Sequence, residues 1–521
     1  MRTPPLLSPT SSIQVSAARA SPLRVLFIAW LLLGAAGTLW CFASPLMSVP
    51  DEPAHAIKAA AVARGQFGGS STGIQGEPLT VNVPGYIAHL GEYSCFAQHS
   101  NVTPACATPI NATDRGWIPA RTSAGNYNPV YYVIVGMGSR GLSGEAAVYA
   151  MRLISTWMAA FFLAGIFCAA SSLRRFHMPV IASAIALTPA VLFLSGSVNP
   201  NALEIAATGA VFMSLCAIFE QSAIAARISR LILVVVALSG ALLANTRPLS
   251  LLWLAIAATA AVLCYGVPTM LRTLTKRGFQ IALLIVGLSS LFALWWVVSV
   301  KSFESLLTGS EPIPADVAAV SMLDRTFGFI AEYVGVLGWL DTYPPAAVIF
   351  TWVLGMGFLL VLGLTARPIR NRWPLAMLSV IVLSVPVALQ ASASESLGWI
   401  WQGRYNLPAL VTLLLVCGIA ARFLPFRITP WKSSILRWTI VLAVLAHVYL
   451  MLEGMRRYTV GIHGDHVNWT EMFEPEWQPP FSWQGLTIAY VVVLAVAGVC
   501  LYRMLTARQL PVAKTRTPSR H

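Results

Sequence analysis

Runs of about 20 apolar residues recur from one end of this chain to the other. An α-helix rises 1.5 Å per residue, so a run of that length crosses the roughly 30 Å of hydrocarbon in a bilayer. Only helices can span with such runs, because each backbone N–H and C=O must be hydrogen-bonded within the segment. Only 10% of the 521 residues are charged, against roughly 25% in soluble domains. The sequence therefore predicts an all-α polytopic membrane protein.

About a dozen runs are predicted to be spans, the fifth of them short. They cover residues 24–46, 147–171, 178–198, 201–223, 230–245, 248–267, 279–300, 346–365, 373–391, 405–422, 435–453 and 486–505. The first run is longer than the 7–15 apolar residues of a signal peptide, so we expect a retained span. Residues 24–505 then form a single membrane domain between a cytoplasmic tail (1–23) and a basic cytoplasmic tail (506–521).

The distribution of charge predicts the orientation of the spans. Placing the N-terminus in the cytoplasm gives every inner loop at least two Lys or Arg residues, whereas only Glu220 of the 20 acidic residues lies near the inner face. This is the positive-inside pattern. We therefore expect a multi-pass protein of the bacterial inner (cytoplasmic) membrane with both termini cytoplasmic. The inner loops hold most of the basic residues, which argues against nucleic acid as the partner of the +14 net charge.

Three external segments are longer than turns. They cover about residues 47–146, 301–345 and 454–485 and hold nearly all the acids. Loops of this length usually have a function, so any chemistry is expected outside. Cys95 and Cys106 are the two cysteines outside the spans, and an oxidising compartment favours a disulfide between them. No Cys or His spacing resembles a zinc site.

The first external segment begins with Pro50-Asp51-Glu52-Pro53-Ala54-His55. Proline suits the start of a helix, and acids suit its positive N-terminal end. A short interfacial helix is expected to run to Arg64 and end near Gly65. Asp51, His55 and Lys58 would then approach one face. Solvated charges around a helix cap would explain the same residues without chemistry.

A second aromatic stretch, Tyr127-Asn128-Pro129-Val130-Tyr131-Tyr132, lies later in the same segment. With Val133–Gly136 it is apolar but too short to span, so a second interfacial helix is expected. An aromatic belt at headgroup depth would account for Tyr131 and Tyr132 equally well.

Charged residues at the outer ends of spans form a further group. Arg247 lies in the tight turn between the fifth and sixth spans, where a charge is costly and usually functional or paired. Glu204 and Arg152 are similar cases. Arg404 enters the tenth span from outside and can bind phosphate through its planar fork of donors. A snorkelling arginine is the simpler alternative.

Polar residues of three further motifs lie on the same rim. Asn201 belongs to Ser197-Val198-Asn199-Pro200-Asn201, for which turn chemistry alone is a sufficient reason. Asp341 follows Gly338-Trp339-Leu340 before the eighth span, while Gln402 and Tyr405 flank Arg404.

Together these motifs resemble a known family. Pro50–His55 with Gly65 resembles the first-loop signature of GT-C glycosyltransferases, and Asn128–Tyr132 resembles their Pro-Pro-Leu-Tyr-Tyr element. With Ser197–Asn201, Gly338–Asp341 and Gln402–Tyr405 following in order, the chain is similar over roughly 25–455 to the bacterial membrane family called domain of unknown function 2142. That family is grouped with the GT-C fold.

The resemblance implies an inverting glycosyltransferase that takes a sugar from a polyprenyl-phosphate carrier at the extracytoplasmic face. The acceptor would be a glycan or lipid of the cell envelope. Asp51 is the implied general base, with Glu52 as an alternative base or orienting group and His55 assisting. Arg247 and Arg404 are implied phosphate ligands. The remaining implied substrate contacts are Lys58, Tyr131, Tyr132, Asn201, Asp341, Gln402 and Tyr405.

Two features leave alternatives open. Members of the family often have Asp where this chain has Asn201, and GT-C enzymes differ in their use of a divalent metal. A transporter or flippase of lipid-linked sugars would predict repeats and polar residues at the membrane midplane. The sequence shows no repeat, and its polar residues cluster at the outer rim, which favours the enzyme. A non-catalytic scaffold of envelope biosynthesis would tolerate a change of Asp51.

Overall fold

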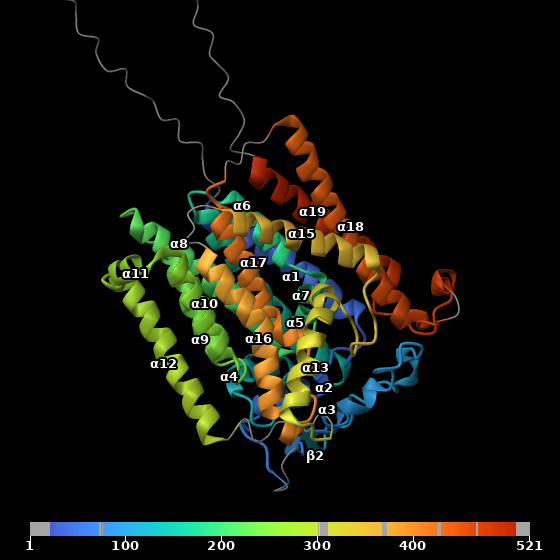
Figure 1. The fold of residues 1–521 in the computed structure, drawn as a ribbon. Helices are drawn as coiled ribbons and strands as arrows, with labels where there is room; N and C mark the ends of the chain where they lie inside the picture. The colour runs from blue at the N-terminus through green and yellow to red at the C-terminus, as the bar shows by residue number, and fades with distance from the viewer. Residues whose placement is uncertain are drawn as a thin grey trace, which may run out of the picture.

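The chain folds into a bundle of helices (Figure 1). The computed structural model describes residues 21–71, 74, 77–300, 302, 311–366, 372–424, 429–464 and 467–506. Within these residues nine helices are long and apolar enough to cross a membrane. They are α1 (Pro22–Ala43), α5 (Glu145–Ser172), α8 (Pro200–Ala223), α12 (Arg277–Ser299), α15 (Ala346–Thr365), α16 (Arg372–Leu397), the 3₁₀ turn η5 with α17 (Gly403–Asn406, Leu407–Ala421), α18 (Pro430–Val460) and α19 (Trp483–Thr506).

Each predicted span coincides with a helix or a bent pair of helices. The polytopic helical prediction is confirmed, but the count is smaller than twelve. Counting each bent pair as one span gives up to eleven in the described residues. The fifth predicted span is α9 (Arg230–Ala244), which at 15 residues is short for a crossing.

The third predicted span, 178–198, is not a continuous helix. It consists of α6 (His177–Ala186) and α7 (Pro189–Ser195), bent by 63°. Pro189 has no N–H to continue the helix, and a residue before proline is driven to extended angles. Thr188 has those angles, with φ −65° and ψ 157°. The predicted segment is therefore broken between Ala186 and Pro189.

The sixth predicted span also ends in a bend. After α10 (Ser250–Tyr265) the chain turns by 108° into α11 (Val267–Leu274). Gly266 makes the turn with φ 87°, a value that glycine adopts without a steric cost. The crossing segment therefore ends at Tyr265, slightly earlier than predicted.

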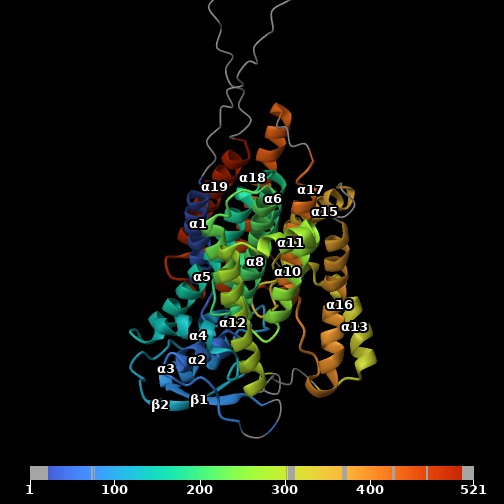
Figure 2. The ribbon, with the colours of Figure 1, turned by 90° about the vertical axis from the view of Figure 1, so that its left-hand side faces the viewer.

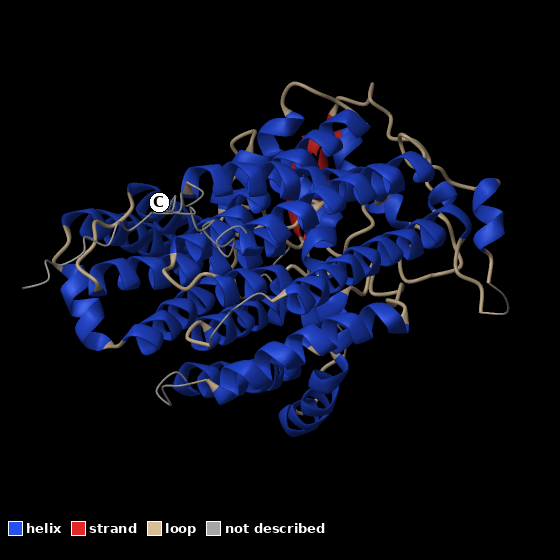
Figure 3. Ribbon diagram, turned by 90° about the horizontal axis from the view of Figure 1, so that it is seen from above, coloured by secondary structure: helices blue, strands red, loops and turns tan. Residues whose placement is uncertain are grey.

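The segment predicted to be the first external one contains a small sheet that the all-α prediction missed. Strands β1 (Leu79–Pro84) and β2 (Trp117–Thr122) are antiparallel, in a register that pairs Leu79 with Thr122. Figure 2 shows both strands with α2 (Glu52–Val62) and α3 (Gly85–Ala88) at one end of the bundle, which we call the loop end. The two strands are the red elements among the blue helices of Figure 3.

The other external segments also contain helices. Residues 301–345 include α13 (Ala315–Gly328) and α14 (Ile330–Val334), and α18 continues seven residues beyond the predicted end of its span. The predicted interfacial helix of the aromatic stretch is α4 (Pro129–Gly136). Of the predicted tails, residues 1–20 and 507–521 lie outside the described residues.

Burial separates a central pair of spans from a lipid-facing ring. The most apolar window of α8 is entirely buried and that of η5 with α17 is 94% buried, whereas α12 is only 17% buried. An apolar helix surface left uncovered by protein is what a bilayer solvates. Helix α2 is buried along nearly its whole length, so it is enclosed by other elements.

Candidate functional site

Asp51 precedes α2 in a backbone conformation that non-glycine residues rarely adopt. Its φ is 66°, in the left-handed region that costs such a residue about 1 kcal/mol. The helix then starts with Glu52 and Pro53, and proline has no N–H to leave unpaired there. The side chain of Asp51 is 42% exposed, while that of Glu52 is fully buried. Of the two adjacent acids, Asp51 is the accessible one.

Arg404, in the 3₁₀ turn η5, binds Asp51 although the two residues are 353 positions apart in the sequence. Its Nη2 donates to Oδ2 of Asp51 at 2.5 Å and to the hydroxyl of Tyr405 at 3.1 Å, and its Nη1 donates to the carbonyl of Pro50 at 3.2 Å. The Nε group has no hydrogen-bond partner among the described residues. Arg404 is thus fixed at 5% exposure, with three of its five N–H donors committed within the described residues.

A second guanidinium group lies over the same aromatic ring. The Cζ atom of Arg247, in the turn between α9 and α10, is 4.5 Å from the ring centroid of Tyr405. The Cζ atom of Arg404 is 5.0 Å from that centroid. The negative face of an aromatic ring attracts cations at such distances. Two neighbouring guanidinium groups offer charge-assisted hydrogen bonds to an anion such as phosphate.

Glu204, buried in α8, compensates the charge of Arg247. Its Oε2 is 3.3 Å from Nη1 of Arg247, and its Oε1 accepts a hydrogen bond from the Ser250 hydroxyl at 2.7 Å. The side-chain amide of Asn201 donates to Oε2 at 3.2 Å. An ionised aspartate at position 201 would instead put a second carboxylate there, so the amide suits this surrounding.

His55 lies one helical turn after Asp51 and is buried. Its Nδ1 is 2.9 Å from the hydroxyl of Tyr132, and its ring centroid is 5.9 Å from that of Tyr127. Burial lowers the pKa of His55 to about 3, although the negative charge of Asp51 opposes that shift. At neutral pH His55 is therefore uncharged, and its hydrogen bond with Tyr132 fixes the orientation of its ring.

Opposing influences act on Asp51. Burial alone would raise its pKa, but the positive charge of Arg404, together with His55 and Arg247, lowers it below the ordinary value. Asp51 is therefore ionised at neutral pH. Any anion that draws Arg404 and Arg247 away would raise that pKa and make the carboxylate a stronger base.

Tyr127 completes the cluster, although its motif gave no reason to single it out beside Tyr131 and Tyr132. Burial raises the pKa of Tyr127, and the charge of Arg247 acts against that rise. Its position before α4 offered no sequence signal, because only folding brings it to Arg247. We call Asp51, His55, Tyr127, Arg247, Arg404 and Tyr405 the loop-end cluster.

Glu52 points away from the loop-end cluster into a buried ion pair with Arg152 of α5. Its Oε1 and Oε2 accept hydrogen bonds from Arg152 at 2.7 and 2.6 Å, and Oε1 also accepts the backbone N–H of Val198 at 3.0 Å. Arg152 donates its remaining N–H groups to three carbonyls, those of Cys41, Ser44 and Pro45. All five guanidinium donors are used, so this pair joins α1, α2, α5 and the start of α8.

Lys58 and Tyr131 also lie apart from Asp51. Lys58 donates to the carbonyls of Phe67 and Gly125 at 2.6 and 2.5 Å, and burial lowers its pKa to about 7. The Tyr131 hydroxyl is 2.9 Å from the Ser155 hydroxyl. The predicted approach of Asp51, His55 and Lys58 to one face thus holds for the first two only.

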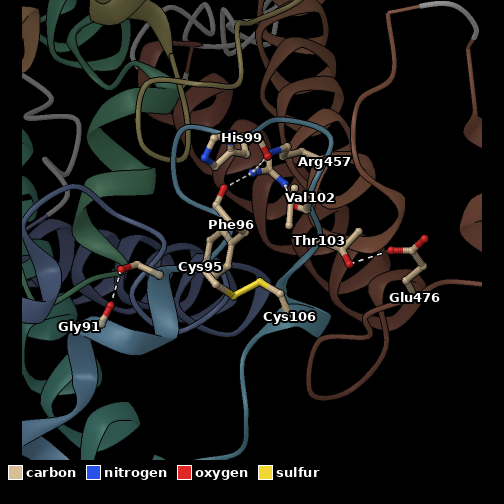
Figure 4. Close-up of a disulfide and its surroundings, with 10 residues drawn as sticks. Gly91, Cys95, Phe96, His99, Val102, Thr103, Cys106, Arg457 and Glu476 are labelled. Atoms are coloured by element: carbon tan, nitrogen blue, oxygen red, sulfur yellow. Dashed lines mark hydrogen bonds between the residues drawn. A yellow bond between two sulfur atoms is a disulfide. The ribbon is translucent and has the colours of Figure 1, made fainter.

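Asp341 belongs to a separate contact, with Arg457 of α18. Figure 4 shows Arg457 beside the segment that carries Phe96, His99 and Val102. Arg457 donates to Asp341 at 3.2 Å and, from the same guanidinium group, to three backbone carbonyls, those of Phe96, His99 and Val102. Those carbonyls lie inside the loop closed by a Cys95–Cys106 disulfide. Asp341 and Arg457 therefore anchor the disulfide loop to α18.

A small cavity adjoins the loop-end cluster. Its polar lining includes Arg404 and Glu332 of α14, and its apolar lining includes Phe193 and Leu194 of the bent segment α7. Glu332 accepts the backbone N–H of Gly403 at 2.7 Å, so it holds the turn that carries Arg404. Gln402, one residue earlier, has its Oε1 buried without a hydrogen-bond partner in the described residues. Glu332 was not predicted, because a side chain that bonds a distant backbone group leaves no sequence pattern.

A family model described as "Predicted membrane protein (DUF2142)" matches residues 32–414. The chain belongs to this family. No curated protein sequence matches the chain.

The part shared with the DUF2142 family contains the whole loop-end cluster. The match begins within α1 and ends within α17, so it includes Asp51, Arg247 and Arg404. Helices α18 and α19 follow the match, and Arg457, which anchors the disulfide loop, belongs to that added part. The family description gives a membrane protein and no activity.

A divalent metal was left open by the sequence. In the ranges that the structure describes, no group of three or more His, Cys, Asp or Glu side chains is arranged to hold a metal ion. The carboxylates of Asp51 and Glu204 each face a guanidinium group instead. Among the described residues this donor set does not fit a metal site.

Proposed function

We propose that the protein is a GT-C-like glycosyltransferase that moves a sugar from a polyprenyl-phosphate carrier to a cell-envelope acceptor at the extracytoplasmic face. One observation carries the proposal. An accessible carboxylate, Asp51, lies beside two guanidinium groups that share the ring of Tyr405. A base next to a phosphate site is what transfer from a lipid phosphate requires.

Arg247 and Arg404 would bind the carrier phosphate. When the bond between the sugar's anomeric carbon and the phosphate oxygen breaks, the electron pair goes to the phosphate. The two guanidinium groups stabilise that developing charge. Both side chains are largely buried, with 12% and 5% exposure, and low exposure strengthens such interactions.

Asp51 would accept the proton of the acceptor hydroxyl as its oxygen bonds to the anomeric carbon. In the free protein Arg404 pairs with Asp51 and lowers its pKa, which makes it a weak base. A carrier phosphate competes for the same guanidinium donors. Binding of the donor would therefore raise the pKa of Asp51 at the moment when a base is needed.

His55 and the tyrosines would orient the site. His55 is neutral and bound to Tyr132, so it offers a polar group without adding charge beside the phosphate. Tyr405 supports both arginines. Glu52 has no place in this scheme because Arg152 and Val198 occupy both its oxygens.

The test uses the full-length protein in detergent with a polyprenyl-phosphate sugar, and compares the wild type with Asp51→Asn. We expect transfer to fall roughly 100-fold, the scale of losing a general base, while binding of the carrier phosphate is retained. Asp324→Asn, an exposed acid of α13, is the matched control and should leave transfer unchanged.

The rival functions give different results in the same assay. A transporter would bind the carrier, transfer nothing, and move lipid-linked sugar across a vesicle membrane. A scaffold would tolerate Asp51→Asn in every readout. Equal transfer by the wild type and Asp51→Asn would remove Asp51 as the base.

A further inference from the structure

A second pair of arginines shares an aromatic ring at the opposite end of the bundle. Arg175 follows α5 and Arg422 follows α17, and their Cζ atoms lie 4.8 and 4.3 Å from the ring centroid of Phe423. Nη1 of Arg175 also donates to the carbonyl of Phe423 at 3.3 Å. Both spans run from the loop end to this point, so the pair lies where the bundle leaves the bilayer.

The two arginines differ in exposure. Arg422 is only 8% exposed, and its guanidinium group also lies 5.0 Å from the ring centroid of Tyr265. Arg175 is exposed. Arg422 is therefore fixed between two aromatic rings, while the exposed side chain of Arg175 can change its conformation. This combination suits a site for an anion at a membrane surface.

Neither arginine forms a salt bridge with a carboxylate in the part of the chain that the structure describes. The nearby acid, Glu220, accepts the backbone N–H of Arg174 at 2.6 Å and the hydroxyl of Tyr265 at 3.3 Å. Its two oxygens are thus committed to groups other than the guanidinium pair.

The loop-end cluster shows what compensation looks like in this protein. Arg404 and Arg247 share the ring of Tyr405, and each has its own carboxylate. Arg175 and Arg422 repeat the shared ring without the carboxylates. Two like charges that share a ring and form no salt bridge among the described residues favour an anion from outside the chain.

We propose that Arg175, Arg422 and Phe423 form a binding site for the phosphate of an anionic phospholipid in the adjoining leaflet. The ligand chemistry is a phosphate group, which planar guanidinium donors recognise well. A lipid is the favoured source because the site lies at the ends of two spans, where headgroups are concentrated and basic pockets between helices bind them.

The experiment measures lipid binding to the full-length protein by native mass spectrometry in detergent. Phosphatidylglycerol is the anionic probe, phosphatidylcholine the zwitterionic probe and inorganic phosphate the free-anion probe. We compare the wild type with Arg175→Gln/Arg422→Gln. Arg174→Gln removes one charge at the same surface and serves as the control, because Glu220 contacts only the backbone of Arg174.

We expect the wild type to bind phosphatidylglycerol at least roughly tenfold more tightly than phosphatidylcholine. The double variant should lose that preference and Arg174→Gln should keep it. A preference that survives the double variant, or is lost equally in Arg174→Gln, would overturn the site. Equal binding of inorganic phosphate would overturn the lipid as its ligand.

The lysine variant Arg175→Lys/Arg422→Lys covers a failure of the glutamine variant to fold. It keeps both charges but loses the planar forks and the stacking on Phe423. We expect it to bind phosphatidylglycerol several-fold more weakly than the wild type, and unchanged binding would contradict the assigned geometry. Neither measurement depends on glycosyl transfer, so its outcome is separate from the proposed function.

Discussion

Asp51 and Glu52 are neighbours in the sequence, yet they lie in two different kinds of ion pair. Glu52 and Arg152 are both fully buried, and every guanidinium donor of Arg152 has a partner. Asp51 is 42% exposed, and its partner Arg404 has only three of its five N–H donors committed within the described residues. The first pair is closed to a ligand and the second is open to one.

The difference follows from where the partners come from. Arg152 reaches Glu52 from inside the bundle and also binds the carbonyls that end α1, so its removal would leave several buried polar groups unpaired. Arg404 comes from a turn at the loop end, above α17. A buried charge without its partner is costly, whereas a pair that water reaches from one side, as at Asp51, contributes less to stability. The two pairs should therefore respond very differently to the loss of one charge.

The largest effect is expected for Glu52→Gln. It leaves the charge of Arg152 buried without a counterion, which typically costs about 3–5 kcal/mol. Thermal unfolding in detergent should show a large drop in midpoint or a failure to fold. Glu92→Gln, at a side chain that is 74% exposed, is the matched control and should change little. A small loss for Glu52→Gln would mean that water or another group compensates Arg152.

A smaller effect is expected for Glu204→Gln, which breaks the ion pair between Glu204 and Arg247. Glu204 is 1% exposed but its partner Arg247 is 12% exposed, so solvent can compensate part of the freed charge. The loss of one charged hydrogen-bond partner suggests about 1–3 kcal/mol. The same unfolding assay should place this variant between Glu52→Gln and Glu92→Gln. A loss as large as that of Glu52→Gln would show that exposure does not separate these pairs.

The sequence predicted which charges had to be paired but not how. Charges at Arg152, Glu204 and Arg247 lie in or beside apolar runs, where an unpaired charge is costly, and each does have a partner in the structure. The choice of partner depends on packing between segments more than 40 positions apart. For that reason Glu52 was a candidate base from its sequence neighbourhood, although it is a buried anchor.

Local signals were reliable where backbone chemistry alone decides the structure. Helix α2 starts at Glu52, one residue before the predicted Pro53, and ends at Val62, two residues before the predicted Arg64, and α4 lies in the aromatic stretch where a second helix was expected. The apolar run over 178–198 gave no indication of the 63° bend at Pro189. The strands β1 and β2 are short and pair across a long connection, so no local pattern identified them. Tyr127 and Glu332 join the site only through tertiary contacts.

His55, beside Asp51, is expected to make the stability of the protein depend on pH. Its folded pKa of about 3 is below the ordinary 6.5, so between these values the unfolded chain binds a proton that the folded protein does not. Stability is therefore retained above pH 6.5 and falls as the pH decreases toward 3, by at most about 1.4 kcal/mol per pH unit. His55→Gln should flatten this slope in unfolding measurements across that range.

The groups that face His55 do not reverse this sign. Asp51 favours the charged ring, while Arg247 and Arg404 and the burial beside Tyr132 disfavour it. His89→Gln, at an exposed histidine of the same external segment, is the control and should keep the wild-type slope. An unchanged slope in His55→Gln would mean that other groups cause the acid sensitivity.

The smallest effect on stability is expected for Asp51→Asn, the variant that should abolish transfer. Asparagine adopts the left-handed conformation at position 51 as readily as aspartate. Its side-chain oxygen can still accept a hydrogen bond from the buried Arg404, and water reaches the pair from the side of position 51, where Asp51 is 42% exposed, so we expect a loss of about 1 kcal/mol. The unfolding midpoint should therefore lie close to that of the wild type, far above that of Glu52→Gln. A loss comparable to Glu52→Gln would make Asp51 a second structural anchor, and the contrast between the two adjacent acids would fail. A stable Asp51→Asn protein without transfer would instead mean that Glu52 stabilises the fold while Asp51 takes part in the reaction.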